Sequence, residues 1–188
     1  MSEVKSVYNL KKDDNFIIFV NSLKKYLLTT RFSKSTWNEN ILYRQKNPKI
    51  KCIYCSPVPI SKKIKTDSLI FVLEMNNEEN KIMGIGLVRN NAVYGKYKVY
   101  HEKEDYNKYV YAGNKRINRE DFKTEEEKAI LEVLETLCFK GKKNLKRGTG
   151  LKLFPLEYLF KCYKEKIDIV DIISGIFRVV ILKKELSV

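Results

Sequence analysis

The sequence has few of the side chains that metal and hydrolase sites usually need. Among its 188 residues, His101 is the only histidine and lies in the charged run 101–105, which is typical of a solvated turn. Cys52 and Cys55 have the spacing of half a zinc site, but Cys138 and Cys162 do not form a second close pair. We therefore expect no catalytic histidine and no bound metal. The cysteines are best interpreted as reduced thiols.

Long apolar runs are also lacking. The longest, at residues 16–20 and 176–182, are far shorter than a bilayer span. The first residues contain no apolar segment followed by a cleavage site for a signal peptidase. We therefore expect an intracellular protein, cytoplasmic or nuclear, with no membrane partner.

Neither common nucleotide-binding glycine motif is present. The glycine-bearing loop at 140–150 lacks the Gly-Lys-Ser/Thr ending of a phosphate-binding P-loop. Gly84 and Gly86 lie inside an apolar strand pattern, without the third glycine of a dinucleotide fingerprint. We expect no cofactor. Two glycines on one face of a strand instead permit a bend, or the close approach of a ligand or another backbone.

Acidic residues are in deficit, with 23 Asp and Glu against 37 Lys and Arg, for a net charge of +14. Such an excess favours association with a polyanion. A compositional origin is the alternative, because Lys, Asn and Ile abound along the whole chain, as an AT-rich coding sequence would produce. The local distribution of the cations has to decide between the two.

The hydrophobic patterns predict a single α+β domain over residues 1–188, in which residues 1–48 form a helix and a loop that pack on the remainder. We expect a mostly antiparallel central sheet or small open barrel, flanked by about four helices. The expected helices cover residues 14–28, a segment beginning after the cap Thr124, and a segment opened by Pro155. Residues 29–48 are predicted to be a loop. Strands are expected at 50–55, 68–75, 81–89, 93–101, 106–111 and 176–182.

The strongest local charge signal is the basic loop, defined here as residues 140–150. It contains five cations and no acid: Lys140, Lys142, Lys143, Lys146 and Arg147. Cations bind phosphates, and glycines leave backbone N–H groups free to face an oxyanion. The alternative is a solvated turn after a helix, where the dipole favours cations. We expect phosphate contacts here, together with Arg116 and Arg119.

Aromatic rings alternate with cations between Tyr94 and Arg119, where Lys115 is one of the interleaved charges. Bases stack on such rings. Tyrosines three residues apart cannot share one face of a strand, so some of these rings must be packing residues. The candidates for a base-stacking pocket, with the two glycines, are Trp37, Tyr43, Tyr97, Tyr109, Gly84 and Gly86.

Two resemblances follow from these segments. The run from Glu74 through 83–88 to 106–111 and 116–119 resembles uncharacterised proteins of nucleocytoplasmic large DNA viruses. That resemblance implies a viral protein located in the host cell, and it implies no particular activity. A loop with Trp37, a strand, and a hairpin strand ending in Ile-Gly-Ile-Gly-Leu-Val is similar to PUA-like modules of the EVE, ASCH and YTH type. That similarity implies a modified or flipped base held in an aromatic pocket.

Three functions therefore remain as hypotheses. The leading one is a non-enzymatic protein that binds RNA or single-stranded or modified DNA through a basic surface and an aromatic pocket. The second is a structural or assembly protein of a large DNA virus that binds acidic protein partners. The third is a metal-dependent nuclease, which would need the fold to gather carboxylates from Asp67, Glu74, Glu102, Glu104 and Asp105.

Overall fold

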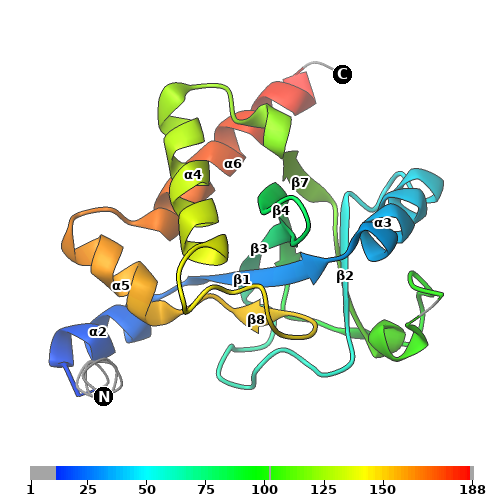
Figure 1. Cartoon of the computed structure of the whole chain (residues 1–188), viewed down its shortest axis with the longest axis horizontal. Helices are drawn as coiled ribbons and strands as arrows, with labels where there is room; N and C mark the ends of the chain where they lie inside the picture. Colours follow the sequence, from blue (N-terminus) through cyan, green and yellow to red (C-terminus); the bar gives the residue numbers. More distant parts are fainter. Residues whose placement is uncertain (1–11, 102, 187–188) are drawn as a thin grey trace.

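A five-stranded mixed sheet forms the centre of the protein. The computed structural model describes residues 12–101 and 103–186, and its elements are arranged as in Figure 1. The sheet has the order β7-β4-β3-β1-β8. Only the central pair β1 and β3 is parallel, so the prediction of an α+β fold with a mostly antiparallel sheet is confirmed. The five strands are β1 (Lys25–Phe32), β3 (Leu69–Asn76), β4 (Lys81–Arg89), β7 (Lys115–Asn118) and β8 (Lys152–Leu153).

A second, smaller sheet lies beside the first. It has three antiparallel strands in the order β2-β6-β5, and the two sheets do not close into one barrel. Every residue of its edge strand β2 is buried. Its strands are β2 (Cys52–Ser56), β5 (Val93–Tyr94) and β6 (Tyr109–Gly113). Two 3₁₀ helices flank β6 and β7, namely η1 (Glu104–Lys108) and η2 (Arg119–Asp121).

Alternate residues of the central strands enter two separate hydrophobic cores. On β1 and β3, Leu27 and Phe71 point toward the helices, whereas Leu28 and Val72 point toward the second sheet. The helical core is closed by α2 (Asp14–Ser22), α4 (Glu125–Phe139), α5 (Leu156–Lys164) and α6 (Ile169–Leu186). The fifth helix of the described residues, α3 (Lys34–Lys46), lies on the other side of the molecule from α2 and α5 (Figure 1).

The hairpin β3–β4 and the two helices predicted from capping signals are confirmed. Thr124 and Glu127 form the expected reciprocal capping box at the start of α4, and α5 begins directly after Pro155. None of the described helices has both the length and the apolar character needed to cross a bilayer.

The prediction of one helix over residues 14–28 is wrong. The helix α2 ends at Ser22, and the following residues form β1. Leu27 and Leu28 fit a helical repeat, but in a strand Leu27 enters the core under the helices and Leu28 enters the core beside the second sheet. In addition, all eight residues of β1 pair with β3. Thr29 and Thr30, which are β-branched, also suit the strand.

Two further assignments are corrected. The predicted loop 29–48 contains the end of β1 and the helix α3, which Ser33 and Thr36 cap reciprocally. The predicted strand 176–182 is part of α6 instead. A continuous apolar run does not distinguish a strand from a buried helix. In α6, Val180 is buried, whereas Val179 and Leu182 are exposed, which places only one side of the helix on the sheet.

The tyrosine-rich segment contains less strand than expected. Of residues 93–101, only Val93 and Tyr94 pair with a neighbouring strand. The predicted strand at 106–111 starts three residues later, at Tyr109, after η1. Asn107 stabilises the irregular stretch, because its side chain accepts from the backbone N–H groups of Val99 and Tyr100 and donates to the carbonyl oxygen of Tyr100.

Candidate nucleic-acid interface

Two adjoining cavities form a continuous basic surface along α6. They have volumes of about 720 and 240 Å³ and share Lys115 and Ile181 in their linings. Among the described residues, no carboxylate lines either cavity. We call this surface the basic groove and define it by its seven cations: Lys25, Arg44, Lys51, Lys115, Arg116, Arg178 and Lys184.

Segments far apart in the chain supply these cations. Arg44 comes from α3, Lys51 immediately precedes β2, and Lys115 begins β7, while Arg178 comes from α6. The C-terminal part of α6 is held beside β7 because Lys184 forms an ion pair with Asp121 of η2, at 2.5 Å. None of the described carboxylates pairs with Lys51 or Arg178, and both side chains are exposed.

A buried ion pair lies at the inner wall of the groove. The guanidinium of Arg116 donates from Nε to both carboxylate oxygens of Glu74 at 3.0 Å, and from Nη2 to Oε2 at 2.5 Å. Burial alone would lower the pKa of Arg116, but the Glu74 carboxylate outweighs burial and raises this pKa above its ordinary value. Arg116 therefore stays charged, although only 9% of its surface is exposed.

Tyr54 completes this network from the second sheet. Its hydroxyl donates to Glu74 Oε1 at 2.7 Å. Burial, followed by the adjacent carboxylate, raises the pKa of Tyr54 well above its ordinary value. The phenol therefore remains a hydrogen-bond donor, and it links the two sheets through Glu74.

The close approach expected at Gly84 and Gly86 is made by the chain's own side chains. A Cβ at Gly84 would overlap the guanidinium of Arg116, and a Cβ at Gly86 would overlap the Tyr54 hydroxyl. The glycines therefore make room for the Glu74 network, and the space above them is already filled.

Trp37 lies between the groove and the hydrophobic core beside the second sheet, which contains Leu28 and Val72. Its ring has the guanidinium carbons of Arg44 and Arg116 at 5.6 and 5.8 Å from its centroid, and Phe32 contacts it edge-on. Burial, followed by the neighbouring Arg116, lowers the pKa of Arg44. Trp37 therefore supports two cations of the groove through cation–π contacts.

The other predicted rings also take part in packing. Tyr43 and Tyr97 form an edge-to-face pair at 6.3 Å, and Tyr109 packs at 4.7 Å from Tyr94. Lys108 lies over the Tyr109 ring. Tyr43, Tyr97 and Tyr109 all remain partly exposed.

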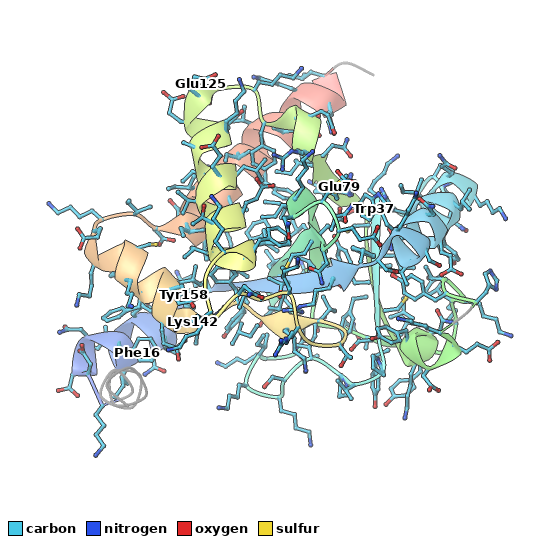
Figure 2. All side chains as sticks on the ribbon, viewed as in Figure 1. Phe16, Trp37, Glu79, Glu125, Lys142 and Tyr158 are labelled. Carbon is cyan, nitrogen blue, oxygen red and sulfur yellow. The ribbon has the colours of Figure 1, made fainter. Side chains whose placement is uncertain are left out.

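The structure does not place the basic loop in the groove. Lys142 lies on the α5 side of the molecule, whereas Trp37 lies on the α3 side (Figure 2). Four of the loop cations are exposed: Lys140, Lys142, Lys143 and Arg147. Lys146 is partly buried and lines a different cavity. Of the two arginines expected to act with the loop, Arg116 lines the groove, and Arg119 forms an ion pair with Glu135.

Sequence reasoning missed Lys25, Lys51, Arg178 and Lys184. Each is an ordinary surface cation in its own segment, and only the fold brings it to the groove. Arg44 follows the candidate Tyr43 in the sequence, and Lys115 precedes Arg116, for which the sequence already predicts phosphate contacts; these neighbours were the signal that pointed to this surface.

Within residues 12–101 and 103–186, the carboxylates named for a nuclease are not gathered into one cluster. Glu74 is engaged by Arg116, and the described residues contain no group of three or more His, Cys, Asp or Glu placed to hold a metal. Glu102 lies outside the described residues. Cys52 and Cys55 are both free and buried, and burial raises the pKa of each thiol to about 12.

Comparison with protein-family models and with curated proteins found no match to this chain.

Proposed function

We propose that the protein binds RNA or single-stranded DNA, with the phosphate backbone lying in the basic groove. The observation that carries this proposal is the groove itself, which gathers seven cations and is lined by no described carboxylate; two of the seven, Arg116 and Lys184, are paired with Glu74 and Asp121 behind the lining. Phosphate contacts by such side chains supply most of the affinity of sequence-independent binding.

The surroundings of the groove support this function. Arg44 is held by Trp37 and by a hydrogen bond to Asn40, so it loses little freedom when a phosphate binds. Tyr43, which precedes Arg44 on α3, keeps part of its ring exposed and is available for base stacking.

The test is the salt dependence of binding to labelled single- and double-stranded RNA and DNA, measured by fluorescence anisotropy. We expect the logarithm of the binding constant to fall linearly with the logarithm of salt concentration. The double variant Lys51→Ser/Arg178→Ser should reduce the magnitude of this slope by about 1 for each phosphate that the variant no longer binds.

The matched control is Lys62→Ser/Lys161→Ser. It removes two exposed cations that do not line the groove, so the change in net charge is the same. An equal decrease in affinity for both double variants would show that binding depends on net charge alone, and it would contradict binding in the groove. Absence of binding by the wild type at low salt would contradict the function and leave the acidic protein partner as the alternative.

A further inference from the structure

A third cavity, of about 240 Å³, lies where the parallel strands β1 and β3 end. It shares no described lining residue with the basic groove. Its lining contains five hydroxyl groups, one carboxylate (Glu78) and three cations: Arg31, Lys103 and Lys146. We call it the Arg31 cavity.

Arg31 is a largely enclosed cation without a carboxylate partner among the described residues. Its Nε donates to the carbonyl oxygen of Leu145 at 2.6 Å, and its Nη2 donates to the Thr29 hydroxyl at 3.0 Å. Its Nη1 is buried and has no partner in the described part of the chain. Burial lowers the pKa of Arg31, which reflects a desolvated charge that none of the described anions compensates. Such groups are costly unless an anion is supplied.

A second unsatisfied polar atom lines the same part of the structure. Asn77 donates from Nδ2 to the carbonyl oxygen of Lys146 at 2.8 Å, but its Oδ1 is buried without a partner among residues 12–101 and 103–186. Arg31 and Asn77 thus both hold the basic loop, at Leu145 and Lys146, and Gly148 packs against the guanidinium. The loop therefore brings one of its cations to the cavity.

Glu78 and the start of α3, which also line the cavity, are already engaged by the chain itself. Glu78 accepts the backbone N–H of Lys34 at 2.8 Å and, in the described structure, forms no ion pair with Arg31. The first turn of α3 is capped by Ser33, whose hydroxyl accepts from the N–H of Thr36. The uncompensated group is therefore the guanidinium, and the end of the helix is satisfied by the chain itself.

We propose that the Arg31 cavity binds the phosphoryl group of a small phosphorylated molecule, with Arg31, Lys103 and Lys146 balancing its charge. At roughly 30 Å³ per water, the volume equals about eight water molecules, which suits a phosphoryl group with a small substituent. This site is independent of the basic groove and of the function proposed for it.

The experiment is calorimetric titration of the full chain, in a buffer free of phosphate, with three probes. These are inorganic phosphate, a nucleoside 5′-monophosphate and the unphosphorylated nucleoside. We expect saturable binding of the first two and none of the third. Tighter binding of the monophosphate than of phosphate would identify a nucleotide as the source of the phosphoryl group, and equal binding would identify free phosphate.

The variants are Lys103→Ser and Lys146→Ser, with Lys142→Ser as the matched control. Lys142 is an exposed cation of the same basic loop that does not line the cavity. We expect each of the first two to weaken phosphate binding at least fivefold and the control to leave it unchanged. Arg31→Met should abolish binding, but Arg31 also anchors the loop, so the lysine variants carry the test.

Two results would overturn the proposal. One is a wild-type protein that shows no saturable binding at millimolar phosphate. The other is a decrease in affinity in Lys142→Ser as large as that in Lys146→Ser. The groove variant Lys51→Ser/Arg178→Ser should keep its phosphate affinity, which separates failure of this site from failure of the nucleic-acid groove.

Discussion

Arg116 and Glu74 form three hydrogen bonds to each other in a region almost closed to water. The contacts run from Nε to both carboxylate oxygens and from Nη2 to Oε2. The side chains are only 6% and 1% exposed. Both charges have lost their hydration, so each depends on the other.

Breaking this pair from one side should destabilise the fold strongly. Arg116→Met leaves Glu74 buried without its cation, and we expect a loss of about 3–5 kcal/mol in the free energy of unfolding. The double variant Arg116→Met/Glu74→Leu should recover most of that loss, because no charge of the pair is then left unpaired. Urea denaturation measures both. A double variant no more stable than Arg116→Met would show that packing, and not charge, dominates.

The glycine prediction concerns the room that Gly86 leaves for Tyr54. Gly86→Ala should destabilise the protein by about 1–3 kcal/mol, because its Cβ would meet the Tyr54 hydroxyl in a packed core. Tyr54→Phe removes that hydroxyl. The cost of Gly86→Ala should therefore be smaller in the Tyr54→Phe background, and a double-mutant cycle from urea denaturation measures the difference. An additive cycle would place the clash on Cys52, whose Cβ and Sγ also lie 2.8 Å from the added Cβ, and not on Tyr54.

The strands and caps that depend on local chemistry were predictable from the sequence. The structures of β1 and of the end of α6 were not, because Leu27 and Leu28 fit a helical repeat as well as a strand, and the mainly apolar segment 176–182 satisfies either period. Pairing of β1 with β3 decides the first case, and packing of Phe177 against Phe71 fixes α6 on the sheet in the second. The basic groove could not be predicted either, since its cations meet only in three dimensions.

The cations of the basic loop and the cations of the groove should contribute differently to nucleic-acid affinity. Removing Lys140, Lys142 and Lys143 by substitution with serine changes exposed side chains outside the groove. We expect a smaller decrease in nucleic-acid affinity than in a triple variant of Lys51, Lys115 and Arg178. Anisotropy titrations at one salt concentration compare the two sets. If the triple variant of the basic loop lost more affinity than the triple variant of the groove, the interface would lie at residues 140–150, as the sequence pattern alone suggests.

Alkaline pH should destabilise the protein through its buried thiols. Burial raises the pKa of Cys52, Cys55 and Cys138 from the ordinary 9.0 to about 12. Above pH 9 the unfolded chain loses these protons while the folded chain retains them, so deprotonation favours unfolding. This stability is therefore complete below pH 9 and is lost as the pH rises from 9 toward 12.

The magnitude follows from the difference between the two pKa values. At pH 10, each thiol should cost about 1.4 kcal/mol of the free energy of unfolding relative to pH 8. Urea denaturation at the two pH values measures the sum of the thiol contributions together with that of the buried Tyr54, whose raised pKa acts in the same direction. In Cys138→Ala, the difference in the free energy of unfolding between pH 8 and pH 10 should be smaller by the contribution of one thiol. The variant also loses packing, but it does so equally at both pH values. The same slope in wild type and variant would show that Cys138 ionises alike in the folded and unfolded states, contrary to its burial.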